Sequence, residues 1–358
     1  MNIIINSACN LRCPYCFEGN MRAELTQNMT YDDFKDICDF ISTSTTNRKI
    51  NIIGGEPAIH PQFKEMLVLA TQYVETYQLE MTIFTNGIEM LPYMDYVPAR
   101  ASLLVNANSP LTMPKKSFEK MLAFFKEASE RGWNRTDQDE EGNTKTGPRY
   151  TPYATPGCNL YEGLEDYDYF WKILDDYNFN RARVSVSSPR DMYYRLNREK
   201  YFEVMKDRFI QFVVEARKRN LAYLAYDCNL HSYCHFTGDE LMLIDSLTLE
   251  PNDVFRFLGC VGSIEGILPD GQVSGCFGDK YFELLKKPYK EFQTYQEIMD
   301  YLDDVKDRDM PKTRLEKCEG CRLAQFGCTA GCTGFLDGVG YRDGFPPSIT
   351  QSTNKKED

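Results

Sequence analysis

The chain lacks any hydrophobic run long enough to cross a membrane, and no basic segment followed by an apolar one stands at its start. The first cysteine is already residue 9, which leaves no space for a signal peptide. We therefore expect a cytoplasmic protein without membrane contact. With 358 residues and 42% hydrophobic content, the chain can form one large domain and a smaller one.

Positive charge is also in short supply. The 41 basic residues are outnumbered by 53 acidic ones, and the net charge is −12. Such a charge keeps a chain soluble but repels phosphate groups. We therefore expect no broad surface for binding nucleic acid.

Cysteine, in contrast, is abundant: the chain has thirteen, and eight follow residue 227. In a reducing compartment, metal ligation or catalysis is more common for such residues than disulfide formation. The first three, Cys9, Cys13 and Cys16, have C-x3-C-x2-C spacing after an apolar run. Three thiolates on one loop can bind three irons of a [4Fe–4S] cluster and leave the fourth iron open. A zinc loop is the alternative, but structural zinc prefers four ligands and no histidine lies nearby.

The first 220 residues alternate between strand-like and helix-like patterns. Apolar runs predict six strands, at 2–6, 50–53, 81–84, 102–105, about 150–160 and 183–187. Helical spacing predicts helices at 34–41, 63–74, 118–125, 170–177 and 202–213, with a short one at 89–93. Thr30 and Asp33 are placed to cap the first helix, and the charged stretch 133–149 predicts a surface loop. This alternation predicts an α/β fold with parallel strands, whose sites collect at the carboxyl ends of the strands.

A second motif, Gly54-Gly55-Glu56-Pro57, follows the second predicted strand. Glycines let the backbone approach a ligand closely, and Glu56 offers an acceptor for a cationic amine. Together with the cysteine loop, this motif resembles the radical S-adenosylmethionine (radical SAM) superfamily. The resemblance implies a partial (β/α)6 TIM-like barrel over residues 1–220. It also implies that the cysteine loop holds a [4Fe–4S] cluster and that residues 54–57 hold the methionyl amine of SAM.

The same resemblance implies further contacts with SAM. Tyr15 and Phe17 flank Cys16, where members of the superfamily pack an aromatic ring and backbone against adenine. Asn106 ends the fourth predicted strand, although its surroundings depart from the Ser-Leu-Asp-Gly type of run found in related enzymes. Residues 85–87 and Ser187 end the third and sixth strands, and each either contacts ribose or only terminates a strand.

The later cysteines resemble the SPASM extension of radical SAM enzymes, which holds two auxiliary [4Fe–4S] clusters. Cys260, Gly271 and Cys276 match its first element. A second run has C-x2-C-x6-C-x3-C spacing, one residue longer than usual, and consists of Cys318, Cys321, Cys328 and Cys332. The usual seventh cysteine is missing. We expect a small cysteine-rich auxiliary-cluster domain at 221–340 and a C-terminal tail at 341–358.

Two earlier cysteines, Cys228 and Cys234, can replace the missing seventh cysteine as cluster ligands. In our expected partition they join Cys260 and Cys276 in one auxiliary cluster, while the second run holds the other, and no iron stays open. In the crossed partition of the SPASM family, Cys332 moves to the first cluster, the early pair takes no part, and each cluster keeps an open iron. Zinc is the alternative for this module, because its spacing also fits a zinc ribbon.

The two remaining cysteines, Cys38 and Cys158, are expected to be packed core thiols. Cys38 lies on the apolar face of the first predicted helix, and Cys158 lies near the end of the fifth strand, where it could instead face the cavity.

The resemblance implies an enzyme, a radical SAM oxidoreductase or maturase, in which SAM is cleaved reductively to a 5′-deoxyadenosyl radical that takes a hydrogen atom from a substrate. A peptide or protein side chain is the expected target, with oxidation or rearrangement of a small metabolite as the alternative. A non-catalytic iron–sulfur or zinc protein is a third hypothesis. Phe277 stands where sulfatase-maturing members have Asp, which argues against that substrate. The expected partners are an electron donor such as flavodoxin or ferredoxin and a separate peptide-recognition protein, because Cys9 leaves no room for an N-terminal recognition domain.

Overall fold

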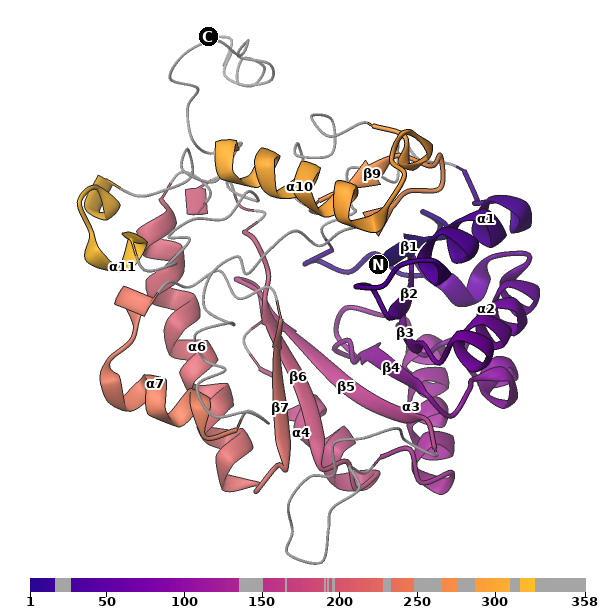
Figure 1. Ribbon diagram of the computed structural model, residues 1–358. Coiled ribbons are helices and arrows are strands. Elements are labelled where there is room, and N and C mark those ends of the chain that lie inside the picture. The colour runs from indigo at the N-terminus through magenta and orange to yellow at the C-terminus, as the bar shows by residue number, and fades with distance from the viewer. Residues whose placement is uncertain are drawn as a thin grey trace, which may run out of the picture.

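A computed structural model of the chain describes residues 1–16, 27–134, 151–164, 166–189, 191, 193–194, 197–227, 233–247, 266–275, 287–309 and 316–325. Its strands form one nine-stranded sheet in the order β7-β6-β5-β4-β3-β2-β1-β8-β9 (Figure 1). Neighbours from β7 to β8 run parallel, and β8 and β9 pair antiparallel. No pairing within the described residues joins the two outer strands. The sheet is therefore open, as expected for a partial barrel.

The six strands expected from the sequence are all present, close to their expected bounds. They are β1 (Asn2–Ile4), β2 (Lys49–Ile53), β3 (Glu80–Thr85), β4 (Ala101–Asn106), β5 (Tyr153–Leu160) and β6 (Arg181–Val186). Only β1 ends clearly early, because Asn6 leaves the ladder and forms an isolated bridge with Asn28. This departure opens the end of β1 toward the cysteine loop.

The five expected amphipathic helices also form. They are α1 (Tyr31–Ser42), α2 (Phe63–Tyr77), α3 (Lys115–Glu130), α4 (Asp168–Asp176) and α6 (Arg198–Lys218). Thr30 caps α1 as expected, because its hydroxyl accepts a hydrogen bond of 3.1 Å from the N–H of Asp33. The short helix expected at 89–93 is the 3-10 helix η4 (Leu91–Tyr96). The loop expected at 133–149 lies mostly outside the described residues.

The sheet continues beyond the six expected strands on both sides. β7 (Tyr223–Asp227) pairs with β6, and the short strands β8 (Gly266–Ile267) and β9 (Val273–Ser274) extend the other edge from β1. Three further described helices lie in the segment assigned to the auxiliary domain: α7 (Gly238–Asp245), α10 (Tyr295–Asp309) and the short α11 (Arg322–Gln325). The expected boundary at residue 220 thus falls just before a strand of the same sheet.

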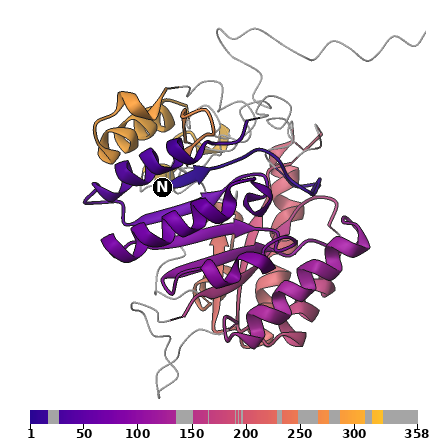
Figure 2. The same cartoon turned by 90° about the vertical axis from the view of Figure 1, so that its right-hand side faces the viewer.

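The outer face of the sheet is apolar. Residues paired across parallel strands share a face, and one such row has no solvent exposure; it consists of Ile3, Ile52, Ile83, Leu103 and Ala154. Helices lie along this outer side of the sheet, with α1, α2 and α3 prominent in Figures 1 and 2. The main hydrophobic core therefore lies between the sheet and its helices.

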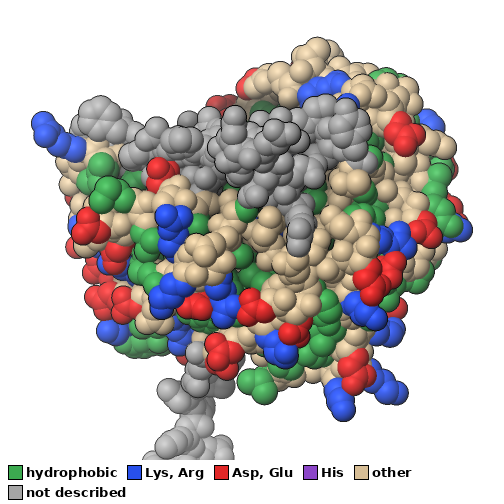
Figure 3. Space-filling view, turned by 90° about the horizontal axis from the view of Figure 1, so that it is seen from below, with side chains coloured by type: hydrophobic (Ala, Val, Ile, Leu, Met, Phe, Trp, Pro, Cys, Tyr) green, Lys and Arg blue, Asp and Glu red, His purple; other side chains and the backbone are tan. Residues whose placement is uncertain are grey.

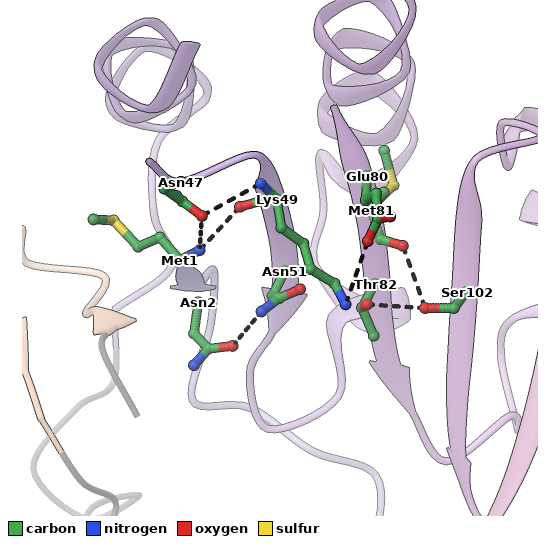
Figure 4. A network of polar contacts seen from close by, with 9 residues as sticks. All are labelled: Met1, Asn2, Asn47, Lys49, Asn51, Glu80, Met81, Thr82 and Ser102. Atoms are coloured by element: carbon green, nitrogen blue, oxygen red, sulfur yellow. Dashed lines mark hydrogen bonds and ion pairs between the residues drawn. The ribbon is translucent and has the colours of Figure 1, made fainter. Parts of the chain in front are cut away.

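The inner face carries rows of polar side chains as well as apolar ones such as Phe84 and Leu104, which pair two positions beyond Thr82 and Ser102. Near the amino ends of the strands, Asn51 Nδ2 donates a 3.0 Å hydrogen bond to Asn2 Oδ1, and the hydroxyls of Thr82 and Ser102 lie 2.9 Å apart (Figure 4). Burying such groups is costly unless they are paired with protein, water or ligand. A row of amides and hydroxyls therefore suits an interior that holds polar contents rather than a dry core.

Both cysteines expected to be core thiols are buried. Cys38 on α1 and Cys158 on β5 are 0% exposed. Burial raises the pKa of the Cys158 thiol to about 12, and it also raises the pKa of Cys38. Both therefore stay protonated near neutral pH, which makes them poor metal ligands.

None of the described helices is both long and apolar enough to span a membrane. On the face shown in Figure 3, acidic and basic side chains are interspersed, and the described residues there form no broad patch of either sign.

Candidate functional site

The cysteine loop starts at the carboxyl end of β1 and is held by the glycine motif that ends β2. Gly55 donates a backbone hydrogen bond of 2.9 Å to the carbonyl of Asn6, and Glu56 donates one of 2.8 Å to that of Ala8. A Cβ at Gly54 would lie 2.2 Å from Asn6 Oδ1, and one at Gly55 would lie 2.2 Å from the Ala8 carbonyl oxygen. The two glycines therefore allow the chain itself to pass this close, and they fix where the cysteine loop begins.

The loop places three sulfur atoms on one short turn. Cys9, Cys13 and Cys16 are half-buried, and the N–H of Cys16 donates to the carbonyl of Cys13 at 3.1 Å. Leu11 is buried and anchors the middle of the loop, where its N–H lies 3.4 Å from Cys9 Sγ. In the described part of the chain, no three Cys, His, Asp or Glu side chains converge on a single-ion site. A [4Fe–4S] cluster binds its thiolates at separate irons, so three spaced, partly accessible thiols fit it.

Glu56 is 1% exposed, and its carboxylate is engaged by the protein. Oε1 accepts hydrogen bonds from the Thr85 hydroxyl at 2.7 Å and the N–H of Ala58 at 3.2 Å, and Oε2 accepts one from the N–H of Asn86 at 2.7 Å. Burial raises the pKa of Glu56 to about 7, although these hydrogen bonds act in the opposite direction. Glu56 also caps the 3-10 helix η3, which Pro57 begins (Pro57–Ile59). An amine of SAM would therefore have to share this carboxylate with three protein donors.

The β3 end segment 85–87, expected to contact ribose or to terminate a strand, engages the cysteine loop. Asn86 Nδ2 donates a 2.7 Å hydrogen bond to Asn10 Oδ1 and lies 3.9 Å from Cys9 Sγ. Asn86 is 6% exposed. The end of β3 is therefore part of the site through a contact with the loop itself.

Tyr15 connects the cysteine loop to the end of β4. Its hydroxyl donates to Asn108 Oδ1, and its ring centroid lies 5.6 Å from that of Tyr161. Burial raises the pKa of Tyr15 well above its ordinary value, and the neighbouring Cys13 raises it further, so the hydroxyl keeps its proton. The Nδ2 of Asn108 in turn donates to the carbonyl of Asn106 at 3.3 Å. Phe17, the second expected aromatic contact, lies outside the described residues.

Asn106 ends β4 as expected and belongs to a polar cluster that spans three strand ends. Its Oδ1 accepts hydrogen bonds from Asn159 Nδ2 at 3.1 Å and from Arg183 Nη1 at 3.2 Å. The Ser185 hydroxyl donates to Asn159 Oδ1 at 2.6 Å. This cluster lies on the inner face at the carboxyl ends of β4, β5 and β6, where ligands of parallel sheets bind.

Ser187 follows the end of β6. Its N–H donates to the carbonyl of Leu160 at 2.9 Å, and its own carbonyl accepts a hydrogen bond from the hydroxyl of Tyr201. The backbone of Ser187 thus terminates the strand, while its half-buried side chain stays near the carboxyl edge of the sheet.

Sequence reasoning missed four of these site residues, namely Asn108, Asn159, Arg183 and Ser185. A signal for some of them was present. Polar residues at alternate positions of β6, Arg181, Arg183 and Ser185, mark one face of the strand, and the prediction of a strand at 183–187 did not distinguish its two faces. Asn108 lies beyond its strand, so no periodicity could mark it.

The expected auxiliary domain contains eight cysteines, of which three are described. Cys234, in η5 (Tyr233–His235), is exposed, and Cys318, at the end of η8 (Glu316–Cys318), and Cys321 are half-buried. The other five lie outside the described residues: Cys228, Cys260, Cys276, Cys328 and Cys332.

The η5 and η8 segments approach the same end of α6 from distant parts of the chain. The ring of His235 packs on Phe202 with centroids 4.8 Å apart, and Lys317 forms an ion pair of 2.8 Å with Glu199. Residues 199 and 202 are one turn apart on α6 and share a face. The hydrogen bond with Glu199 raises the pKa of Lys317, and both neighbouring cysteines, one from each segment, raise it further. The docking thus brings a cysteine of η5 toward one of η8.

Comparison with known proteins agrees with this architecture. Residues 3–138 match the model of the radical SAM superfamily. The matched segment runs from β1 past the end of α3 and contains the cysteine loop, the glycine motif and the ends of β3 and β4. This part of the chain is therefore similar to a radical SAM domain.

Two curated relatives align with a quarter of the chain. An S-adenosylmethionine-dependent nucleotide dehydratase of Selenomonas ruminantium is 32% identical over 91 residues, which are 25% of this chain and 31% of that protein. A GTP 3′,8-cyclase of Chlorobaculum tepidum is 33% identical over 90 residues, which are 25% of this chain and 26% of that protein. The chain thus spans less than a third of either relative.

Solved structures extend the likeness to the whole fold. The crystal structure of Streptococcus suis SuiB matches with a TM-score of 0.55 and 15% identity, covering 93% of this chain and 72% of that one. The structure of SuiB bound to its precursor peptide SuiA gives a TM-score of 0.56 at the same identity, covering 93% of this chain and 71% of that one. At this identity the likeness concerns the fold.

Proposed function

We propose that the chain is a radical SAM enzyme that modifies a side chain of a peptide or protein. One observation carries the proposal. Residues 54–56 hold the loop of Cys9, Cys13 and Cys16 at the carboxyl edge of the sheet through backbone contacts. The loop lies beside the inner face, which carries amide and hydroxyl side chains. Thiol ligands and a polar interior at one edge of a parallel sheet suit a cofactor and a polar substrate bound side by side.

In this proposal the three cysteines hold three irons of a [4Fe–4S] cluster, and the fourth iron is open to SAM. The groups that would line SAM are Tyr15, Phe17, Gly54, Gly55, Glu56, Pro57, Asn106 and Ser187. When bound and reduced by one electron, from flavodoxin or ferredoxin for example, the cluster and SAM supply methionine and a 5′-deoxyadenosyl radical that takes one hydrogen atom from the substrate. The polar cluster around Asn106 and Arg183 would orient that substrate at the strand ends.

Anaerobic reconstitution with iron and sulfide, followed by SAM and dithionite, tests the proposal. We expect 5′-deoxyadenosine from the wild type, none above background from Cys13→Ala, and near wild-type amounts from Cys38→Ala. The last variant is a matched control, because Cys38 is a buried core thiol. Equal 5′-deoxyadenosine from the wild type and Cys13→Ala would refute the assignment.

Two facts support a peptide substrate. The fold similarity to SuiB covers 93% of the chain, and that protein is seen with a precursor peptide. The sheet is also open within the described residues, with β7 and β9 at its two edges. A separate recognition protein would then deliver the peptide.

A small metabolite is the second candidate, since the names of the two curated relatives, each aligned with a quarter of the chain, refer to nucleotides. The two candidates differ in which deuterium-labelled substrate would transfer deuterium to the 5′-deoxyadenosyl radical. Deuterium from a labelled candidate peptide should appear in 5′-deoxyadenosine if the substrate is a peptide. Transfer from labelled nucleotides alone would favour the metabolite.

We further propose that residues 221–340 hold auxiliary [4Fe–4S] clusters through Cys228, Cys234, Cys260, Cys276, Cys318, Cys321, Cys328 and Cys332. The docking of η5 and η8 on α6 supports one change from the partition expected above. It favours a cluster that draws Cys234 together with Cys318 and Cys321.

Iron analysis tests this module. Three clusters require about 12 irons per chain, whereas a zinc module leaves about 4 irons plus bound zinc. If Cys234 shares a cluster with Cys318, then Cys234→Ala and Cys318→Ala should each lose the same cluster signal, and the double variant should lose no more. Additive losses would support the partition with Cys260 and Cys276.

A further inference from the structure

The contact between Asn86 and the cysteine loop has no counterpart in the expectations from sequence. Asn86 Nδ2 lies 3.9 Å from Cys9 Sγ, within the range of an N–H···S hydrogen bond, and it donates to the neighbouring Asn10 Oδ1 at 2.7 Å. One amide group thus touches two adjacent residues at the start of the loop.

The orientation of Asn86 is set by two other polar contacts. Its backbone N–H donates to Glu56 Oε2 at 2.7 Å, and its Oδ1 accepts from the N–H of Ile88 at 3.0 Å. Because Oδ1 is used in this turn, Nδ2 must point the other way, toward Cys9. The assignment of oxygen and nitrogen in the side chain is therefore fixed by the donors and acceptors around it.

Glu56 holds Asn86 in this orientation. Its two oxygens bind Thr85, the last residue of β3, and Asn86, the residue after it, so the strand end cannot rotate without breaking both contacts. A series of hydrogen bonds thus connects the glycine motif to the Cys9 sulfur, from Glu56 to Asn86 and from Asn86 to Cys9.

We propose that Asn86 is a positioning residue for the N-terminal cluster: its amide holds Cys9 in place and donates an N–H···S hydrogen bond to the Cys9 ligand, which favours the reduced state of the cluster. This inference rests on the proposed function, because it requires a cluster on Cys9. Hydrogen bonds to ligand sulfur stabilise the extra negative charge of a reduced cluster, and so raise its reduction potential.

The experiment is a redox titration of the reconstituted full chain, followed by electron paramagnetic resonance, with the spectrum of Cys13→Ala subtracted to remove signals from other clusters. We expect the midpoint potential of Asn86→Ala to be more negative than that of the wild type. Asn86→Asp should shift it further in the same direction, because a carboxylate replaces the donor beside the thiolate. Asn134→Ala is the matched control, since Asn134 is a buried asparagine, 4% exposed, whose amide donates to Ser129 Oγ and to the carbonyls of Tyr177 and Asn178, which are not part of the loop.

The outcomes separate the two proposals. If the wild type and Cys13→Ala give the same spectrum, the proposed function fails. If they differ but both Asn86 variants keep the wild-type potential at full iron content, only the role of Asn86 is overturned. Loss of the N-terminal cluster from both Asn86 variants, with normal loading of Asn134→Ala, would support the positioning role, because the contact is then needed to hold the loop.

Discussion

The hydroxyl of Thr85 donates a 2.7 Å hydrogen bond to Oε1 of Glu56 and so links the ends of the neighbouring parallel strands β2 and β3. The two residues are 3% and 1% exposed, respectively. A buried carboxylate is tolerated only while hydrogen-bond donors surround it. Glu56 therefore holds the ends of β2 and β3 together, in addition to any contact it makes with SAM.

The burial of Glu56 should make the stability of the fold depend on pH. Its pKa rises from 4.5 to about 7 on folding, so the folded chain binds more protons than the unfolded chain over this range. The contribution of this group to stability is complete below about pH 4.5 and is lost as pH rises through about 7, by at most about 3 kcal/mol. Anaerobic denaturant unfolding at about pH 5 and about pH 8 measures it. Glu56→Gln, which cannot ionise, should show a smaller change, and an equal change in both proteins would contradict the assignment.

Replacement of Gly55 by alanine should displace the cysteine loop. The new Cβ would lie 2.2 Å from the Ala8 carbonyl oxygen, which is backbone and cannot move aside alone. We expect a loss of about 3 kcal/mol in unfolding free energy, together with loss of iron from the N-terminal site. Gly238→Ala is the control, because its Cβ would meet no atom within 4 Å. Normal iron content in Gly55→Ala would show that the close contact is dispensable.

Removal of the Tyr15 hydroxyl should weaken SAM binding without unfolding the chain. Tyr15→Phe keeps the ring contact with Tyr161 but loses the hydrogen bond to Asn108 that connects the loop to β4. One neutral hydrogen bond contributes about 1 kcal/mol, which corresponds to about a fivefold higher dissociation constant for SAM. Anaerobic calorimetry on the reconstituted protein measures this constant. Tyr77→Phe, at an exposed position, should leave it unchanged, and equal affinity in all three proteins would count against the role of Tyr15.

The two buried cysteines should behave as core residues. Cys38→Ala and Cys158→Ala should each keep the full iron content of the wild type and lose about 1 kcal/mol of stability through a small cavity.

In the native protein both thiols should resist alkylation, because burial keeps them protonated and out of reach. Mass spectrometry after brief alkylation gives the order of reaction, and the exposed Cys234 should be modified first in protein without iron. Iron loss in either variant would make that cysteine a ligand.

Periodicity was enough to predict the six strands and five helices of the first 220 residues, since each helix buries one stripe and each strand is punctuated by turn residues. It was not enough for β7, β8 and β9. Strands β8 and β9 are two residues long, too short for any pattern, and β8 pairs with the edge of β1, which offers unpaired backbone groups. Alternation of polar residues marks one face of β6, but only the register with β5 shows which neighbouring side chains that face meets.

The sequence by itself predicted the class of domain at the N-terminal part of the chain: three cysteines at fixed spacing and a glycine motif one βα unit later resemble the radical SAM superfamily, whose model residues 3–138 match. Short-range spacing can establish this, because the thiolates lie on one loop and need no distant partner. Only the tertiary structure decided the tasks of individual polar groups. Glu56 is held by Thr85, Ala58 and Asn86, and Asn86 in turn contacts Cys9, 77 residues away along the chain. Such pairings depend on the register of parallel strands, which places residues from separate segments at one edge of the sheet and leaves no mark in the local sequence of either.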